Sequence, residues 1–325
     1  MELTPKEPSR VAFVGAGYMG GEHARAFAAA GATLAGVMSR TRSRSEALAG
    51  KFPSLLVCDS IEELRMRTQA DLVVVSVPEL HTRNVLEACF RFPWKVLVEK
   101  PAGFDLVEAE RIRNAGRGHS VFVALNRRYY SSTMAVRGGL ASDQGHRVVH
   151  VVDQEDPEAA RRAGQPEVVV SNWMYANSIH VVDCLRVFAR GEADEVEIIE
   201  PFDPESPSSV VASVRFSSGD LGLYQGLWNR PGPWSATIST PERFYEMRPL
   251  EQAQFRVRTD RQWHAIPAHP RDSEFKPGLM AQAEDALRAC RGESHLLPTL
   301  DDAFASMQLV ARIFEPKQGA AKRIP

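Results

Sequence analysis

The sequence predicts an α/β fold in two parts: an N-terminal Rossmann domain and a C-terminal α+β domain with a largely antiparallel open sheet. Over the first 125 residues, apolar runs alternate with helical patterns, and the glycine-rich loop Gly15–Gly20 directly follows the first run. Beyond residue 126 the apolar runs follow one another with few helical patterns between them. We therefore expect domains at 1–125 and 126–325, with the last helix a candidate to pack back on the first domain.

In the first part, each apolar run has the length of one buried strand and precedes a helical pattern. This alternation implies parallel strands joined by right-handed crossovers. The expected strands are 11–14, 34–38, 55–58, 72–77, 96–98 and 121–125. The expected helices run from the glycine loop to residue 30 and then near 43–52, 61–67, 82–89 and 106–115.

In the second part, turn-forming residues separate most of the apolar runs, as expected for an antiparallel sheet. The expected strands are 196–200, 210–216, 222–228, 236–240 and 255–257, and the expected helices are 177–189, 278–290 and 300–314. The stretch 153–167 is charged and poor in apolar residues, so a loop is expected there.

The composition indicates an ordinary cytoplasmic enzyme. A net charge of −2 gives no basic surface for nucleic acid, and no apolar run is long enough to span a membrane. The four cysteines are scattered, which favours reduced thiols and no metal site. Leu223, Leu227 and Trp228 lie on a strand whose apolar face helices are not expected to cover, which favours a homodimer or homotetramer.

The glycine loop is expected to bind a dinucleotide because it follows a strand and opens a helix. Gly15 permits a tight turn, Gly17 lets backbone N–H groups approach a pyrophosphate, and Gly20 lets the helix pack on the strand. Tyr18 and Met19 complete the loop at the helix N-terminus, whose partial positive charge favours phosphate.

The end of the second expected strand favours NADP(H). An NAD site usually has a carboxylate about 20 residues past the loop, whereas this chain has Ser39 and Arg40, with no acid before Glu46. The planar guanidinium of arginine suits a 2′-phosphate. The alternative is that the arginines here form a solvated helix N-terminus, in which case NAD(H) remains possible.

Two further strand ends carry polar residues. Ser76 and Pro78 follow the fourth strand, and His81 is a candidate for the cofactor ribose or nicotinamide, although a surface histidine is an alternative. Lys100 follows the fifth strand, where ligands bind in doubly wound sheets. An unpaired buried ammonium loses its hydration, so Lys100 is a candidate proton donor or acceptor.

A helical segment in the second part carries a candidate proton-transfer group. On a helical wheel, Val181, Val182 and Leu185 form an apolar face, and His180 projects away from it. Asn177 lies close to His180 on the wheel. Histidine titrates near neutral pH, which suits proton transfer.

Together these motifs resemble the Gfo/Idh/MocA family of sugar oxidoreductases, which includes glucose–fructose oxidoreductase and inositol dehydrogenases. The resemblance covers nearly the whole chain, and its motifs are Gly15–Gly20, Ser76–His81, Glu99–Pro101, Asn126–Tyr129 and Ile179–Asp183. It implies that Lys100 acts in catalysis and substrate placement and also belongs to the cofactor-binding residues. It further implies that Glu99 helps to hold the nicotinamide ribose and that His180 meets the substrate. The candidate substrate-binding residues are Asn126, Arg127, Trp173 and Asn177.

One position departs from the family pattern. The family often has an aspartate four residues before the histidine, and this chain has Ala176 there. Lys100 then carries more of the proton transfer, or the protein is a weak catalyst, or it no longer catalyses. We expect an NADP(H)-dependent oxidoreductase of a sugar, nucleotide sugar or polyol. The alternatives are a non-catalytic ligand sensor and a redox-neutral elimination or transfer with retained cofactor.

Overall fold

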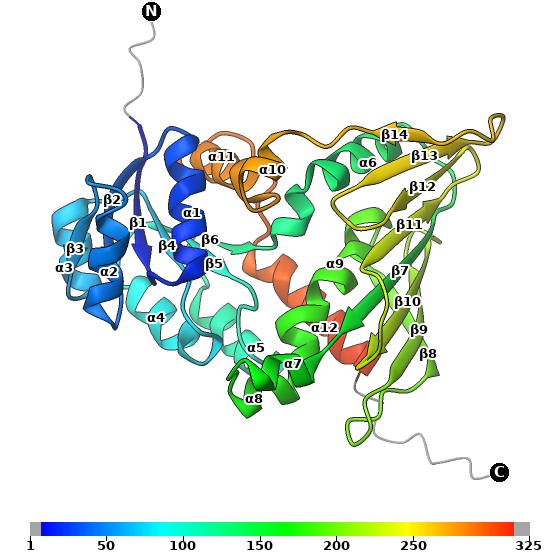
Figure 1. The fold of residues 1–325 in the computed structure, drawn as a ribbon, viewed down its shortest axis with the longest axis horizontal. Coiled ribbons are helices and arrows are strands. Elements are labelled where there is room, and N and C mark those ends of the chain that lie inside the picture. The colour runs from blue at the N-terminus through cyan, green and yellow to red at the C-terminus, as the bar shows by residue number, and fades with distance from the viewer. Residues whose placement is uncertain (1–7, 315–325) are drawn as a thin grey trace, which may run out of the picture. The chain divides into compact units, whose positions relative to one another are not determined.

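The computed structural model describes residues 8–314, which divide into two compact units (Figure 1). Unit 1 contains the chain up to Gly103, together with Val107–Tyr129 and Pro270–Phe304, and unit 2 contains most of the remainder. The sequence-based division at residue 125 differs from this arrangement, because it placed Pro270–Phe304 in the second domain. The start of the last helix belongs to unit 1 and the rest of it to unit 2.

Unit 1 contains a Rossmann-type sheet in which six parallel strands have the order β3-β2-β1-β4-β5-β6. Its strands are β1 (Arg10–Val14), β2 (Thr33–Met38), β3 (Leu56–Cys58), β4 (Leu72–Val75), β5 (Lys95–Glu99) and β6 (Val121–Ala124). Its helices include α1 (Tyr18–Ala29), α2 (Arg42–Ala49), α3 (Ile61–Thr68), η1 (Glu79–His81), α4 (Thr82–Cys89), α5 (Leu106–Ala115), η2 (Asn126–Tyr129), α10 (Arg271–Glu274) and α11 (Leu279–Cys290). These elements confirm the predicted Rossmann domain.

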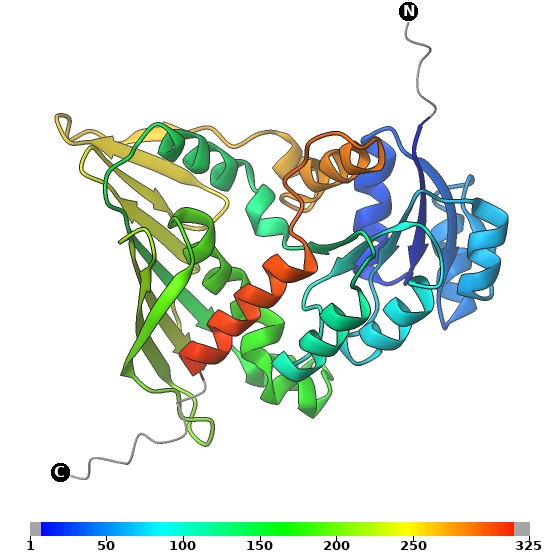
Figure 2. The same cartoon turned by 180° about the vertical axis from the view of Figure 1, so that it is seen from behind.

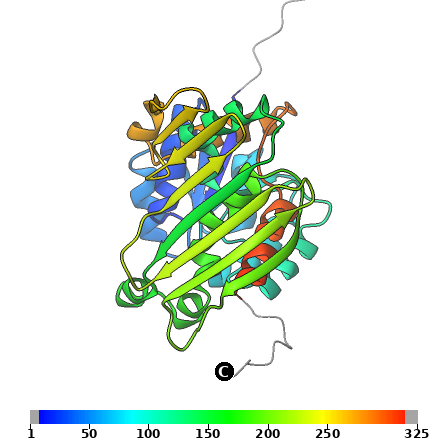
Figure 3. The ribbon, with the colours of Figure 1, turned by 90° about the vertical axis from the view of Figure 1, so that its right-hand side faces the viewer.

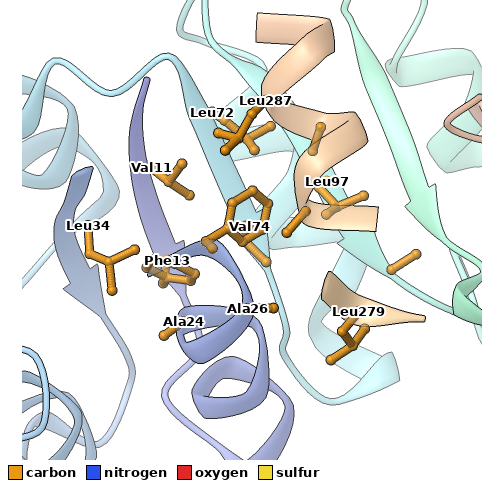
Figure 4. Packing of buried hydrophobic residues seen from close by; sticks show 14 of the residues in the cluster. Val11, Phe13, Ala24, Ala26, Leu34, Leu72, Val74, Leu97, Leu279 and Leu287 are labelled. Atoms are coloured by element: carbon orange, nitrogen blue, oxygen red, sulfur yellow. The ribbon is translucent and has the colours of Figure 1, made fainter. Parts of the chain in front are cut away.

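Both faces of this sheet are covered, as the continuous apolar character of its strands requires. On one face, α1, α2 and α11 bury a cluster that includes Val11, Phe13, Val74 and Leu97 (Figure 4). On the other face, α3, α4, α5 and the first turn of α12 (Leu300–Phe314) cover a second cluster (Figure 2). The sheet therefore presents ligand-binding groups at the ends of its strands rather than on its faces.

Helix α11 belongs to unit 1 because its apolar side chains complete the first cluster. Leu279 and Leu287 are buried there with β4 and β5. The Tyr129 hydroxyl donates to Asp285 Oδ2 over 2.7 Å, which joins η2 to the same helix. The sequence assigned this helix by its position in the chain, whereas packing places it on the Rossmann sheet.

Unit 2 contains a mixed sheet of eight strands in the order β14-β13-β12-β11-β7-β10-β9-β8. Only the β7–β10 pair is parallel among the described strands of this sheet, so the predicted, largely antiparallel sheet is confirmed. The strands are β7 (Val148–Glu155), β8 (Ala193–Glu200), β9 (Ser209–Phe216), β10 (Leu221–Trp228), β11 (Ser235–Ser239), β12 (Arg243–Met247), β13 (Ala253–Val257) and β14 (His264–Ile266). The helices are α6 (Ser131–Ala141), α7 (Pro157–Arg162), α8 (Glu167–Ser171), the π-helical turn η3 (Met174–Ser178), α9 (Ile179–Phe188) and most of α12.

The expected loop at 153–167 is wrong. Its first residues end strand β7, and α7 and α8 follow. Alternate residues of β7 are buried, and Asp153 and Glu155 continue the buried face that Val149 and Val151 begin. Charge predicted a loop because buried carboxyls are rare in strands. The valine-rich run that begins at Val148 was the signal that the prediction missed.

The two faces of the unit 2 sheet differ. Trp228 is buried with Phe202 and Phe314, so grouping it with Leu223 and Leu227 on one exposed face was wrong. Leu223 and Leu227 are half-buried on the opposite face, which no helix covers in Figure 3. Strand alternation explains the separation, because neighbouring residues point to opposite faces. Within the described residues, no helix is long and apolar enough to cross a membrane.

Candidate functional site

The glycine loop in unit 1 has the geometry of an anion-binding turn. Gly15 has φ +106°, and a Cβ there would lie 2.1 Å from the carbonyl oxygen of Ser76. A Cβ on Gly20 would lie 2.2 Å from the Gly15 oxygen, whereas one on Gly17 would meet no atom within 4 Å. Gly17 thus leaves open space where α1 begins. A dinucleotide phosphate fits this cradle, since the first N–H groups of a helix have no intrahelical partner.

The ends of β1 and β4 are joined at this loop. Ser76 Oγ donates to the Gly15 oxygen over 3.2 Å, and the Ser76 N–H donates to Val14 over 2.8 Å. Met19 packs against the apolar cluster, and Tyr18 is 71% exposed with the Lys276 ammonium 5.6 Å from its ring centroid. Of the predicted cofactor residues of this loop, Met19 therefore packs against the apolar cluster, whereas Tyr18 is exposed.

The structure brings together two cofactor candidates from different strand ends. Arg40 Nη1 lies 3.0 Å from His81 Nε2, which follows Pro78 in the turn η1. Arg42 is held differently, since its guanidinium contacts both Asp59 and Glu46. Ser39 Oγ donates to the Thr41 carbonyl over 2.8 Å. Of the two arginines, Arg40 is the one positioned beside another predicted cofactor residue.

A cavity of about 500 Å³ lies against the N-terminal half of α1. Helix α2 forms its other side, and its basic lining residues are Arg25, Arg44 and Lys51, accompanied by Glu22. The sequence analysis did not single out Arg44 or Lys51. Arg44 lies on α2 and Lys51 just after its end, and neither position carried a signal beyond the basic character of the segment that follows Arg40.

Glu99 and Lys100 lie at the end of β5, where Glu99 has a buried partner. His23 Nε2 of α1 is 2.8 Å from Glu99 Oε1, and His23 is 1% exposed. Burial raises the pKa of Glu99, but the hydrogen bond to His23 and the charges of His23 and Lys100 outweigh it and lower the pKa. Glu99 is thereby favoured as an ion that fixes the strand end carrying the half-buried Lys100. His23 had no sequence signal, because nothing in α1 predicts this pairing.

Two predicted substrate residues are held inside unit 1. Asn126 is 4% exposed, and its amide donates to the Pro277 carbonyl over 3.0 Å. Arg127 Nη1 donates to Asn126 Oδ1 over 3.1 Å. These contacts join η2 to the segment before α11, and Arg127 is half-buried.

In unit 2, the segment before α9 is a π-helical turn, a feature that often occurs at functional sites. Ala176 lies in this turn and is 6% exposed, so its four-residue spacing to His180 does not follow α-helical geometry. His180 is 2% exposed, and its ring centroid lies 6.2 Å from that of Trp234. The helical wheel placed His180 off the main apolar face, but the side chain is buried.

Strand β7 contributes two buried carboxyls close to this turn. Asp153 Oδ2 accepts from the Tyr224 hydroxyl over 2.6 Å. Glu155 Oε2 accepts from Trp173 Nε1 over 2.6 Å and from Asn177 Nδ2 over 2.8 Å. Burial and the neighbouring Asp153 raise the pKa of Glu155 well above its usual value. The pair therefore retains a proton to higher pH than separate carboxyls would.

A cavity of about 510 Å³ opens beside this pair within unit 2. Its lining includes Gln154, Glu155, Asp156, Trp173, Asn177 and Trp234, together with two alanines of α7. The predicted Trp173 and Asn177 are thus brought to one cavity, and His180 contacts its wall through Trp234. Sequence reasoning missed Glu155, Asp153 and Trp234. Asp153 and Glu155 lay in the expected loop, and Trp234 directly follows Pro233, which ends the expected turn.

Comparisons with known proteins agree with this architecture. Residues 9–127 match the model of an oxidoreductase family with an NAD-binding Rossmann fold. No curated protein sequence matches the chain significantly.

Similar solved structures share the fold over both units. The UDP-N-acetylglucosamine 3-dehydrogenase GnnA from Acidithiobacillus ferrooxidans has a TM-score of 0.75 at 17% identity, covering 94% of this chain and 96% of its own. The WlbA dehydrogenase from Chromobacterium violaceum, in complex with NADH and UDP-GlcNAcA, has a TM-score of 0.71 at 17% identity, with coverages of 95% and 94%. An NAD-binding oxidoreductase from Klebsiella pneumoniae has a TM-score of 0.77 at 17% identity, with coverages of 94% and 95%.

At these identities the solved structures establish the fold, and the family assignment comes from the match over residues 9–127. That match covers the glycine loop, the Arg40–His81 pair and Lys100, whose geometry is described above. Over these residues the chain is similar to the Gfo/Idh/MocA oxidoreductase family, with its NAD-binding Rossmann fold.

Proposed function

We propose that this protein is an NADP(H)-dependent oxidoreductase that transfers a hydride to or from a sugar, nucleotide sugar or polyol. The observation that carries the proposal is the glycine loop, whose backbone leaves open space at Gly17 for a dinucleotide phosphate. Two structural relatives are named as UDP-N-acetylglucosamine 3-dehydrogenase and as a dehydrogenase bound to NADH and UDP-GlcNAcA. Those names support a sugar-like substrate.

Each candidate residue has a distinct role in the proposal. The nicotinamide, when bound, accepts or releases the hydride. Lys100 hydrogen-bonds the reacting oxygen of the substrate, and His180 donates or accepts its proton. Glu99, held as an ion by His23, orients the strand end that carries Lys100. Ser76 supports the loop that holds the phosphates.

The preference for NADP(H) rests on Arg40. Its guanidinium lies beside His81, whereas the neighbouring Arg42 is engaged by two carboxylates. A guanidinium without a carboxylate partner can bind a 2′-phosphate through charge-assisted hydrogen bonds. Arg44 and Lys51 add positive charge in the cavity between α1 and α2.

The test is oxidation of NADPH or reduction of NADP⁺ against a panel of sugars, nucleotide sugars and polyols. Lys100→Ala should lower kcat about a hundredfold or more, and Lys100→Arg should not restore it, because guanidinium does not release a proton near neutral pH. His180→Ala should also lower kcat, with cofactor affinity unchanged. Full turnover by Lys100→Ala would refute the role of Lys100.

Ala176 favours a second candidate function, that of a non-catalytic NADP(H)-binding ligand sensor. Position 176 holds an alanine where the family pattern often has an aspartate. The same panel separates the two functions. Tight cofactor binding with no turnover on any substrate favours the sensor, and turnover excludes it. Cofactor retained through purification favours redox-neutral chemistry instead.

We also propose that the protein forms a homodimer or homotetramer through the uncovered face of the unit 2 sheet. Leu221, Leu223 and Leu227 lie half-buried on this face (Figure 3). Covering such a surface is favourable because it removes apolar area from water. Leu223→Glu should shift the mass in light scattering towards the monomer. Leu296→Glu, at a leucine of unit 1 that is 58% exposed, is the matched control and should not.

A further inference from the structure

The cavity of unit 2 has walls of aromatic surface. Trp173 and Trp234 both line it. The Trp173 N–H donates to Glu155, and the Trp234 N–H donates to the Gln154 carbonyl over 2.7 Å. Because each indole N–H is used by the protein, both rings are held in place, and they offer mainly apolar surface to a ligand.

Polar groups stand beside these rings. Asn177 and Glu155 line the same cavity, and they are joined by a hydrogen bond of 2.8 Å. Asn177 lies in the π-helical turn, and Glu155 ends β7, so two separate elements fix their positions. A cavity with apolar walls and a few fixed polar groups is the usual form of a small-molecule site.

The charge of the cavity is acidic. Glu155 and Asp156 line it, Asp153 lies behind Glu155 on the buried face of β7, and no lysine or arginine is among its described lining residues. Asp156 forms an ion pair of 3.7 Å with Arg162, which is exposed and is not among the residues that line the cavity. An anionic ligand group placed here would lose hydration without gaining a cationic partner.

We propose that this cavity binds the uncharged, hydroxyl-bearing ring of a sugar or polyol and rejects sugars that carry a carboxylate. The apolar C–H face of such a ring packs on Trp173 or Trp234, and its hydroxyls exchange hydrogen bonds with Glu155 and Asn177. Glu155 is then a specificity-determining residue. The inference rests on the proposed function for its link to catalysis, but the binding itself requires neither cofactor nor turnover.

The protonation of Glu155 suits a hydroxyl ligand, while the rejection of carboxylates rests on the lack of a basic residue in the described lining of the cavity. Burial and Asp153 raise the pKa of Glu155, which favours the neutral carboxyl, a group that both donates and accepts hydrogen bonds. Asp153, beside it, is hydrogen-bonded by Tyr224. A ligand carboxylate would face this pair at close range, whereas a ligand hydroxyl can bond to either protonation state of Glu155.

The first experiment measures binding to the full chain by calorimetry at neutral pH, with and without NADP⁺. The probes are matched pairs: D-glucose with D-glucuronate and D-galactose with D-galacturonate, together with myo-inositol. At least one neutral probe should bind, and its carboxylated partner should bind about tenfold more weakly or not detectably. The proposal is overturned if no neutral probe binds or if a uronate binds more tightly than its neutral partner.

Variants at an exposed position test the charge argument without disturbing the buried pair. Ala159 lies on the exposed side of α7 and lines the cavity. Ala159→Arg should narrow the neutral-to-uronate affinity ratio about fivefold, by supplying the missing cation. Ala159→Gln, of similar length and uncharged, should leave the ratio unchanged. An unchanged ratio in Ala159→Arg would contradict the electrostatic basis of the selectivity.

A tryptophan pair tests the location. Trp234→Leu should weaken binding of the neutral probe about tenfold. Trp263→Leu removes an indole of unit 2 that stacks on Arg256 instead, and it should leave the affinity unchanged. Equal affinities in Trp234→Leu and the wild type would place the sugar elsewhere. Neutral-sugar binding in a protein that fails to bind NADP(H) would preserve this inference while refuting the proposed function.

Discussion

The two candidate sites differ in what forms them: the backbone forms the site in unit 1, and side chains form the site in unit 2. At the start of α1, the backbone forms the site. Gly15 and Gly20 matter because a Cβ there would hit backbone oxygens, and Gly17 matters because it leaves open space. In unit 2, side chains form the site, and buried carboxyls on β7 hold the indole and amide that line a cavity. The first site should therefore tolerate almost no added atoms at Gly15 and Gly20, whereas the second should depend on charge and hydrogen bonding.

The largest expected effect concerns the backbone site. Gly15→Ala places a Cβ 2.1 Å from the Ser76 oxygen at a φ of +106°, so it should cost about 3 kcal/mol of stability. Gly17→Ala is the matched control, because its Cβ would meet no atom within 4 Å. Gly17→Ala should change the free energy of unfolding by less than about 0.5 kcal/mol while weakening NADP(H) binding. Urea unfolding measures the effect on stability, and cofactor titration measures the effect on binding. Similar unfolding midpoints for Gly15→Ala and Gly17→Ala would refute the steric argument.

Cofactor choice tests whether side chains also matter at the first site. Arg40→Asp should weaken NADPH binding about ten- to hundredfold relative to NADH, since losing a charge-assisted hydrogen bond costs about 1.5–3 kcal/mol. Arg42→Ala serves as the control, because Asp59 and Glu46 already engage Arg42. Titrations at one fixed salt concentration measure the ratio. Equal affinities of the wild type for NADPH and NADH would contradict the prediction.

Charge burial in unit 2 gives a pH dependence. Burial raises the pKa of Asp220, but Arg190 and the N–H groups of Arg147 and Arg190 lower it further, to about 2. Since this is below the usual value of 3.8, the stabilisation is complete above about pH 4 and is lost as the pH falls towards 2. The loss should be about 2 kcal/mol. Chemical unfolding between pH 7 and pH 2 measures it, and in Asp220→Asn this part of the pH dependence should be absent.

Glu155 should change the stability with pH in the opposite direction to Asp220. Its pKa is raised in the folded protein, so its contribution is complete below the usual value of 4.5 and is lost as the pH rises towards the folded value. Two carboxyls of one unit thus respond to pH in opposite directions because one has a cationic partner and the other has a second carboxyl. In Glu155→Gln, the free energy of unfolding should not show this decrease as the pH rises. A variant whose stability depends on pH as the wild type does would contradict the raised pKa of Glu155.

The same contrast explains what could be predicted from the sequence. The glycine loop, Arg40 and Lys100 were found because each follows a recognisable strand, and a backbone site is encoded within a few consecutive residues. Asp153 and Glu155 were missed because charged residues are typical of loops, and the partners that hold them inside unit 2, Tyr224, Trp173 and Asn177, are distant in the sequence. His23 and Trp234 were missed because their partners are distant in the sequence.

The smallest expected effect compares one helix cap from each unit. Asp156 caps α7 by accepting from the Ala159 N–H over 2.8 Å, and Ser60 caps α3 by accepting from the Glu63 N–H over 3.0 Å. Asp156→Ala and Ser60→Ala should each cost about 1 kcal/mol. Only Asp156 also lines the unit 2 cavity, so only its variant should alter sugar binding, while cofactor affinity stays unchanged in both. Thermal unfolding together with the two titrations measures this, and a sugar affinity lowered equally by Ser60→Ala would mean that binding reports overall stability rather than the local site.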